Sequence, residues 1–374
     1  RAIITSTKRF GQHGMQFIPV LEYLQMAGRA GRPKYDAVGE AILIASTEAE
    51  RDELLDRYIH GEPEDIYSKL AVEPVLRTYI LSLISSRVVG TRTQLLDFFS
   101  QTFWAHQFKD LAKLSGTIDK MLKLLIDWNF ISGPAQDDFV SAHDFGKDAF
   151  KATFLGKRVA ELYLDPLTAH QMVLALQEAS TLKTLKPISF LHALCTTLEM
   201  RPLLRVGVRE YDLIQSKLVE WDQWLLIREP SAFDPEYEEF LDAVKTTMMF
   251  ADWIDECDEE FLLEKYKVRP GELSAKLDNA DWLLYSMTEL TNILNLNELV
   301  KELARVRLRL KYGAKEELLP LLKLSGIGKV RARKMFIAGL KDIGDVRKVT
   351  IEKLTDVLGK AVALSVKKQV GTND

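Results

Sequence analysis

Apolar residues in the first 60 positions recur with two different periods, which predicts alternating strands and helices. Ala2 to Ile4 and Gly39 to Ala45 are short apolar runs bounded by turn-forming residues, as in buried strands. Between them, residues 21–31 have the spacing of a helix that Pro33 ends, and residues 48–60 predict a second helix. This alternation indicates a parallel sheet, which two strands are too few to complete. We therefore expect further strands upstream of the first residue.

Beyond residue 61 the apolar positions follow a helical period almost throughout. Three amphipathic helices are predicted over residues 75–86, 91–103 and 117–129, the second with Thr91 as its N-cap. Three short strands are predicted at residues 130–133, 139–140 and 152–155. Three helices followed by a small hairpin are typical of a winged helix, which we place at residues 62–164.

The rest of the chain has no strand pattern. An all-helical region is predicted over residues 165–312, where prolines separate successive helices, and it includes one long helix over residues 273–292. A final small helical unit is predicted over residues 313–374. The predicted fold class is therefore mainly α with a partial α/β start.

The composition is that of a multidomain globular protein. A chain of 374 residues with 47% hydrophobic and 28% charged residues is too long for one core and suggests two to four domains. Its two cysteines are too few for a disulfide framework or a four-ligand zinc site, and its histidines are scattered. We therefore expect no metal centre and a reducing, cytoplasmic location. No apolar run reaches the roughly 18 residues that a membrane-spanning helix needs.

Charge is distributed unevenly along the chain, although the net charge is only −4. Residues 229–265 carry 13 acidic and 2 basic side chains, a net charge of −11. Residues 301–374 carry 18 basic and 8 acidic side chains, a net charge of +10. A basic end on an acidic protein favours a polyanionic partner held at that end. We expect the acidic segment to face solvent, away from that partner.

The segment from Gln25 to Pro33, Gln-Met-Ala-Gly-Arg-Ala-Gly-Arg-Pro, has the most specific pattern in the chain. On the predicted helix, Gln25, Arg29 and Arg32 are spaced by four and then three residues, so their side chains would share one face. Two guanidinium groups beside an amide suit a polyphosphate, because arginine offers permanently charged, bidentate donors. Gln25, Arg29 and Arg32 are therefore candidate nucleotide-binding residues, and the two arginines are candidate catalytic arginine fingers.

This segment resembles motif VI of superfamily 2 helicases, and with the preceding residues 18–23 it is similar to that of the archaeal Hjm helicases, relatives of the helicase domain of polymerase theta. The order of the predicted domains fits that family. The resemblance implies the C-terminal part of a second RecA-like domain at residues 1–61, a winged helix at 62–164, a helical ratchet domain at 165–312 and a helix-hairpin-helix DNA-binding domain at 313–374.

The resemblance also implies ATP and Mg²⁺ as cofactors of the intact enzyme. The chain contains no Gly-x-x-x-x-Gly-Lys-Ser/Thr loop for phosphates and no Asp-Glu-x-His motif for magnesium. We therefore expect it to be the C-terminal portion of a longer protein, to need a missing N-terminal RecA-like domain as partner, and not to hydrolyse ATP alone.

Two segments are candidate contacts to the strands of a DNA duplex. Glycines suited to a turn predict a hairpin around residues 10–17, and the resemblance implies that it parts the duplex, with Phe10, Met15 or Phe17 against the last base pair. In the long predicted helix, the resemblance implies that Trp282 stacks on a base, an interaction of about 1–3 kcal/mol. Lys276 is the one charge near the position where the family has an arginine.

The segment Leu324 to Lys334 resembles a helix-hairpin-helix turn. Its glycines allow a tight turn that presents backbone N–H groups to a phosphate at a helix N-terminus. Four basic side chains accompany the turn, and phosphate contacts of this kind give sequence-independent, salt-sensitive binding. The candidate DNA-binding residues here are Lys329, Arg331, Arg333 and Lys334.

The resemblance implies an ATP-dependent DNA helicase that moves 3′ to 5′ on single-stranded DNA, unwinds forked duplexes in replication-linked repair and works as a monomer. Two alternatives stay open. One is an RNA helicase of the related Ski-like branch, which has a similar domain layout. The other is that this portion by itself is a non-enzymatic DNA-binding or regulatory module.

Overall fold

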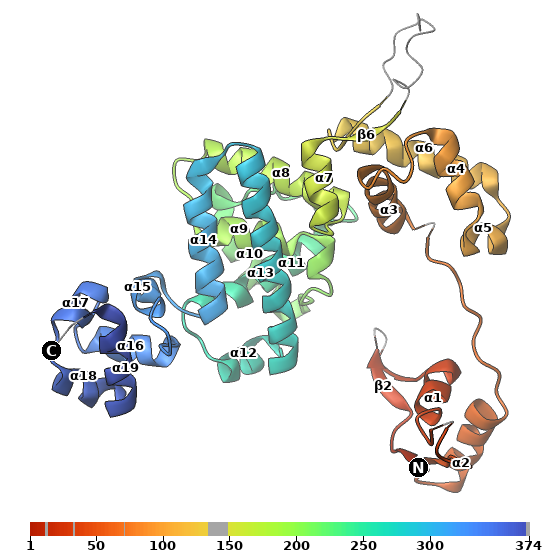
Figure 1. Ribbon diagram of the computed structural model, residues 1–374, viewed down its shortest axis with the longest axis horizontal. Helices are drawn as coiled ribbons and strands as arrows, with labels where there is room; N and C mark the ends of the chain where they lie inside the picture. The colour runs from red at the N-terminus through yellow and green to blue at the C-terminus, as the bar shows by residue number, and fades with distance from the viewer. Residues whose placement is uncertain (12–13, 33, 71, 134–148, 372–374) are drawn as a thin grey trace, which may run out of the picture. The chain divides into compact units, whose positions relative to one another are not determined.

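The computed structural model describes residues 1–371 except 12–13, 33, 71 and 134–148, and is mainly helical (Figure 1). The chain divides into two compact units. The first unit consists of Arg1–Lys69 and Phe103–Lys109, and the second consists of Leu70–Thr102 and Asp110–Asp374.

The first unit contains the predicted strands, and they pair in parallel. β1 (Ala2–Ile4) lies beside β4 (Ala41–Leu43), with Ile3 opposite Ile42. One face of this pair packs on a small core, because Ile4 is buried and Leu43 contacts the same cluster. On the other face, Ile3 is 62% and Ile42 is 41% exposed, so the prediction of a buried second strand is wrong for that face.

Helix α1 (Val20–Ala27) of this unit begins where predicted but ends four residues early. Its first turn is capped by the Glu64 carboxylate, which accepts from the N–H groups of Val20 and Leu21 at 2.7 and 3.2 Å. Beyond the helix the chain turns back, and Gly31 has φ +91° in this turn. Gly39 approaches Ala30 so closely that a Cβ added at residue 39 would lie 1.9 Å from the Ala30 oxygen. The predicted helical face shared by Gln25, Arg29 and Arg32 is therefore wrong. The remaining helices of the unit are α2 (Glu48–Leu54), a π-helical turn (Leu55–Ile59) and α5 (Phe103–Phe108).

The second unit begins with three helices, a short antiparallel pair of strands and a fourth helix, close to the predicted winged-helix pattern. These elements are α3 (Glu73–Ser85), α4 (Arg92–Ser100), α6 (Leu111–Asp127), β5 (Ile131–Ser132), β6 (Lys151–Ala152) and α7 (Phe154–Glu161). Thr91 caps α4, as predicted, and the structure adds a reciprocal capping box with Gln94. The predicted strand at residues 152–155 is shorter, because the Thr153 hydroxyl caps α7. Residues 139–140 lie outside the described residues.

An all-helical domain follows, as predicted. Its main helices are α8 (Pro166–Thr181), α9 (Pro187–Cys195), α10 (Tyr211–Trp221), α11 (Tyr237–Ile254), α12 (Glu259–Tyr266), α13 (Pro270–Ile293) and α14 (Asn297–Tyr312). Short 3₁₀ turns occur at Leu198–Met200, Val208–Glu210 and Asp222–Trp224. Pro187 and Pro270 begin helices α9 and α13, since a proline at the first helical position lacks only an N–H that would be unpaired anyway. The long helix α13 lies alongside α14 (Figure 1).

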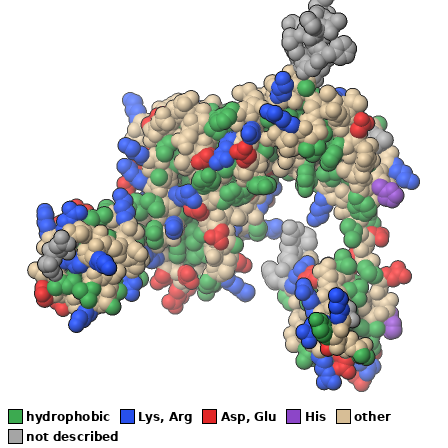
Figure 2. All heavy atoms as spheres, in the orientation of Figure 1, with side chains coloured by type: hydrophobic (Ala, Val, Ile, Leu, Met, Phe, Trp, Pro, Cys, Tyr) green, Lys and Arg blue, Asp and Glu red, His purple; other side chains and the backbone are tan. Residues whose placement is uncertain are grey.

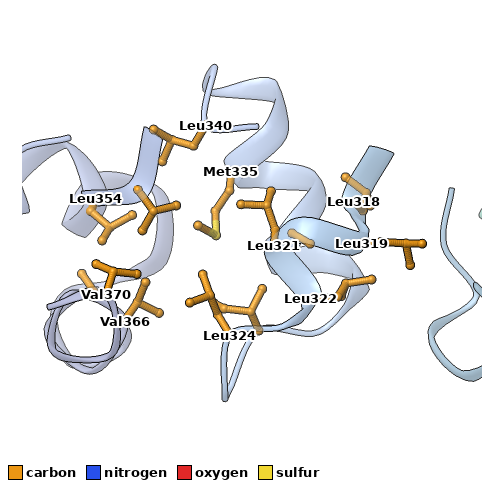
Figure 3. Close-up of a cluster of buried hydrophobic side chains, with 14 of the residues drawn as sticks. Leu318, Leu319, Leu321, Leu322, Leu324, Met335, Leu340, Leu354, Val366 and Val370 are labelled. Atoms are coloured by element: carbon orange, nitrogen blue, oxygen red, sulfur yellow. The ribbon is translucent and has the colours of Figure 1, made fainter. Parts of the chain in front are cut away.

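The C-terminal residues form a compact helical unit with its own core (Figure 3). Its elements are a 3₁₀ turn (Glu316–Leu318), α15 (Leu319–Leu322), α16 (Lys329–Ile337), α17 (Ile343–Lys348), α18 (Ile351–Leu358) and α19 (Lys360–Val370). Leu324 and Met335 point into this core from either side of the glycine-rich turn, and Leu354 and Val366 face them from α18 and α19 (Figure 3). The turn therefore has a rigid base.

One buried side chain of the helical domain gives a pH-dependent stability. His192 is fully buried, neither ring nitrogen has a hydrogen-bond partner in the part of the chain that the structure describes, and burial lowers its pKa to about 4. Between pH 6.5, the ordinary pKa of histidine, and pH 4, this imidazole is protonated in the unfolded chain but stays neutral in the folded chain. Stability should fall by about 3 kcal/mol as the pH drops from 6.5 to 4.

Urea unfolding of the chain across this pH range measures the effect. The variant His192→Leu should lose this part of the pH dependence, while replacement of the exposed His60 by Gln should leave it in place. An identical pH profile for His192→Leu and the parent would contradict the assignment.

The described residues contain no group of three or more His, Cys, Asp or Glu side chains placed to hold a metal ion. Among the same residues, no helix combines the length and the apolar character that crossing a bilayer requires.

Candidate nucleotide and nucleic-acid interface

The arginine-rich segment leaves both guanidinium groups accessible to solvent. Gln25 is exposed in the last turn of α1, and Arg29 is exposed in the turn that follows. No partner of the Arg29 side chain is present among the described residues. Arg32 is 77% exposed, lies 3.6 Å from an Asp36 oxygen and stacks 5.2 Å from the Tyr35 ring centre. Two weakly engaged guanidinium groups close together in the chain suit an anionic ligand with several charges.

The predicted hairpin is present as β2 (Lys8–Gly11) and β3 (Gly14–Phe17), with Phe10 opposite Met15. Met15 is 62% exposed near the turn. Phe17 lies at the base of the hairpin, half-buried, with the Arg57 guanidinium 4.2 Å from its ring centre. Phe17 is therefore part of the hairpin's support rather than its tip. The side chain of Phe10 lies outside the described residues.

Trp282 lies in the middle of α13 and is half-buried. Its indole N–H donates to the Leu162 oxygen at the end of α7 at 3.2 Å. One turn earlier, the Asn279 amide donates to the Glu199 oxygen at 3.1 Å. The tryptophan is thus held in a fixed orientation by its polar edge, while part of its surface remains open to solvent.

Lys276 has a different environment from the one expected of a DNA contact. Its side chain is only 9% exposed, and its ammonium group donates to the Pro202 backbone oxygen. Burial lowers the pKa of this lysine. The structure therefore gives Lys276 a backbone carbonyl as its partner, and we do not carry it forward as a DNA-binding residue.

Two arginines from neighbouring helices contact α13, and neither was among the residues expected from the sequence. Arg307 of α14 makes a bidentate pair with Asp281 at 2.7 and 2.8 Å and lies 5.2 Å from the Tyr285 ring centre. Arg158 of α7 pairs with Glu289 at 2.7 Å and donates to the Tyr285 hydroxyl at 3.3 Å. No local pattern could have revealed their contacts to α13, because their partners on that helix are 26 and 131 residues away along the chain.

The glycine-rich turn of the C-terminal unit has the predicted form. Gly326 has φ +80°, and no atom of the described residues lies within 4 Å of a Cβ added at Gly326 or Gly328. The turn is braced from behind, because the Gln369 side-chain amide exchanges two hydrogen bonds with the Ser325 backbone at 2.8 and 3.0 Å. A ligand could therefore approach the backbone at the N-terminus of α16.

The basic residues around this turn are not equivalent. Arg331 is exposed and donates to the Gly326 oxygen at 2.8 Å, and Lys334 is exposed. Lys329 is half-buried, with its ammonium group 4.8 Å from the Trp253 ring centre. Figure 2 shows Lys and Arg side chains spread over the C-terminal unit. A polyanion would find Arg331 and Lys334 directly accessible.

Arg333, by contrast, is occupied within the protein. It makes a bidentate pair with Glu256 at 2.9 and 2.5 Å and a further bond to Glu317 at 2.8 Å. Its side chain is 26% exposed, and hydrogen bonding to Glu256 raises its pKa further. The acidic segment was expected to face solvent, and for Glu256, which is 17% exposed, that prediction is wrong.

Comparison with known proteins finds similarity between this chain and helicases. Residues 188–313 match a family described as archaeal helicase, domain 4, and residues 39–132 match a helix-turn-helix domain. The chain is similar to the proteins named ATP-dependent DNA helicase Hel308 from Thermococcus kodakarensis (38% identical over 96% of the chain), Pyrococcus horikoshii (34% over 99%) and Pyrococcus abyssi (33% over 100%). It spans 31%, 50% and 52% of these three relatives, respectively.

Proposed function

Because the chain belongs to the archaeal Hel308-type helicases of superfamily 2 and corresponds to their C-terminal portion, we propose that it is the strand-gripping part of an ATP-dependent DNA helicase. The observation that carries this proposal is the similarity over 96–100% of the chain to relatives named as DNA helicases. In this proposal the enzyme moves 3′ to 5′ on single-stranded DNA and unwinds forked duplexes during repair of replication forks.

We assign the nucleotide contact to Gln25, Arg29 and Arg32. Their exposed side chains would face ATP and its Mg²⁺ held mainly by another RecA-like domain, since this chain has no phosphate-binding loop of its own. Charge that develops on the γ-phosphate would then be neutralised by Arg29 and Arg32. The chain by itself should bind nucleic acid without turning over ATP.

The exposed sheet face of the first unit supports the need for a further partner segment. Ile3 and Ile42 lie side by side on that face and are 62% and 41% exposed. Parallel sheets are normally covered on both faces, because their crossover helices lie on both sides. We propose that the rest of the RecA-like region covers these residues in the complete protein.

In the helical part, we assign the DNA strand to Trp282 and to the turn before α16. The hydrogen bond of the indole N–H would hold the Trp282 ring in position to stack on one base. Such stacking tolerates any base, because every base has a π-face. Met15 at the hairpin is the described side chain best placed to meet the last base pair of a fork. Arg331 and Lys334 would then bind phosphates of the departing strand.

Competition binding tests the choice of nucleic acid. The 374-residue chain should bind a labelled single-stranded DNA and lose it to unlabelled DNA at a lower concentration than to RNA of the same sequence. A clear preference for RNA would favour a Ski-like RNA helicase, and no binding to either would overturn the proposal. ATP turnover by the chain alone would contradict the proposal that ATP is held mainly by another RecA-like domain.

The double variant Arg331→Ala with Lys334→Ala should flatten the salt dependence of DNA binding. Each phosphate contact to a single strand contributes about 0.7 to the slope of log affinity against log salt concentration, so the slope should fall by about 1.4. Fluorescence anisotropy between 50 and 300 mM salt measures it, with Lys217→Ala on α10 as a control that removes one positive charge outside the turn. An unchanged slope would remove both residues from the phosphate path.

A further inference from the structure

The acidic segment (residues 229–265) and the basic C-terminal segment (residues 301–374) meet at one place in the second unit. The last turn of α11 and the residues after it contribute Trp253, Asp255 and Glu256, which together we call the α11 corner. All three contact the junction between α14 and the C-terminal unit, or that unit itself. The opposite net charges of the two segments are therefore partly matched inside the protein.

Glu256 uses both carboxylate oxygens on the C-terminal unit. The Arg333 guanidinium donates to them at 2.5 and 2.9 Å, and the Lys315 backbone N–H adds a bond of 3.1 Å. Glu317 of the C-terminal unit accepts from the third edge of the same guanidinium at 2.8 Å. A planar, bidentate pair fixes direction as well as distance, which a single contact to a lysine does not.

Trp253 holds the chain where α14 ends and the C-terminal unit begins. Its indole N–H donates to the Leu310 oxygen at 2.7 Å, and Gly313 packs so tightly on its ring that a Cβ there would lie 2.7 Å from a ring carbon. Gly313 also has φ +59°, so this position favours glycine twice over. The ammonium group of Lys329, the first residue of α16, lies 4.8 Å from the centre of the same ring.

Asp255 completes the junction through Arg309 of α14. The Arg309 guanidinium donates to Asp255 at 2.9 Å, to the Ile254 oxygen at 3.2 Å and to the Ala314 oxygen at 3.3 Å. Arg309 is only 9% exposed. The residues on either side of Gly313 are thereby tied to the same corner.

We propose that the α11 corner is a socket that sets the orientation of the C-terminal unit, and that Glu256 and Trp253 are positioning residues for the DNA-binding turn before α16. Arg333 then acts through Glu256 rather than on DNA. The socket aims the turn, with Arg331 and Lys334, in one direction relative to α13. This rests on the proposed function in one respect, namely that this turn binds DNA.

A distance measurement tests the socket without requiring any DNA. Spin labels are attached to cysteines at Leu213 on α10 and Leu364 on α19, both exposed, in a chain that carries Cys257→Ser. The remaining Cys195 is fully buried and should stay unlabelled. The parent should give a narrow distance distribution, Glu256→Arg a clearly broadened one, and the charge-swapped pair Glu256→Arg with Arg333→Glu a narrow one again. Glu220→Arg on α10 is the matched control and should leave the distribution narrow.

Binding of single-stranded DNA by the same variants separates a positioning arginine from a DNA-binding one. Glu256→Arg should weaken binding by about fivefold or more despite its added positive charge, and the swapped pair should recover to within about twofold of the parent. A distribution that stays narrow in Glu256→Arg would overturn the socket. A swapped pair that restores the distances but not the affinity would make Arg333 a DNA ligand.

If Glu256→Arg fails to fold, as judged by its thermal unfolding, Glu256→Gln is measured in its place and should broaden the distribution to a smaller extent. If the parent binds no DNA while the distances change as expected, the proposed function fails and the socket stands.

Discussion

In the complete helicase, replacing Arg29 with alanine is expected to lower ATP turnover by about 10³-fold or more. The reason is electrostatic. A guanidinium group that reaches the γ-phosphate neutralises charge that grows in the transition state, and an arginine finger of this kind contributes about 10³–10⁵ in rate. Arg29 has no partner among the described residues, so its charge is available for this role.

Steady-state ATP hydrolysis with saturating single-stranded DNA is the measurement. Arg29→Lys keeps the charge but loses the bidentate geometry, so it should recover only part of the activity. Folding should be unaffected, within about 0.5 kcal/mol, because an exposed side chain with no partner among the described residues contributes little to stability. If Arg29→Ala retained turnover within tenfold of the parent, the assignment of this residue to the nucleotide would be wrong.

The largest effect on stability is expected at the ion pair that joins α3 to α8. Arg77 and Asp165 have side chains only 6% and 9% exposed and form a bidentate pair at 2.5 and 2.6 Å. Asp165 also caps α8 by accepting from the Leu167 N–H at 2.9 Å. Replacing Asp165 with alanine leaves a buried guanidinium unpaired, which should cost about 3–5 kcal/mol.

An almost ideal control lies in the same unit. Arg92 and Asp119 form a bidentate pair at 2.6 and 2.8 Å, but both side chains are 47% exposed. Asp119→Ala should therefore cost less than about 1 kcal/mol, since water screens exposed pairs and solvates the remaining partner. Urea unfolding of the two variants compares them directly. Similar losses for both would show that burial is not what distinguishes the two pairs.

A double variant separates the cost of an unpaired buried charge from the cost of the lost helix cap. Replacing both partners, Arg77→Met with Asp165→Leu, removes the buried charges together and should recover most of the loss caused by Asp165→Ala. The part that remains should be close to the roughly 1 kcal/mol that a helix cap contributes.

Local features of the chain were largely determined by the sequence. The long helix predicted over residues 273–292, which the structure shows as part of α13, and the N-cap at Thr91 follow from rules that involve residues three or four apart. The parallel pairing of Ala2–Ile4 with Ala41–Leu43 follows from the alternation of strand and helix. The pattern of Gln25 to Pro33 was specific enough to indicate the family, which the comparisons confirmed.

Other features depended on contacts between residues far apart in the chain. The close approach of Gly39 to Ala30 accompanies the early end of α1 and takes Arg29 and Arg32 off the helix. From the sequence, Lys276 was expected to contact DNA, but its ammonium group donates to the backbone oxygen of Pro202, 74 residues away. Arg333 was also expected to contact DNA, but its guanidinium group donates to the carboxylate of Glu256, 77 residues away.

The physical reason is common to these cases. Backbone periodicity and caps are set by neighbours within one turn of a helix, so a sequence contains them directly. Whether a charged side chain is free or paired depends on which helices pack together and at what angle, and that is decided by the burial of apolar surface over a whole domain. For this protein, the sequence by itself determined the approximate places of most elements and the family, and the tertiary structure decided where α1 ends and which basic residues remain available to a ligand.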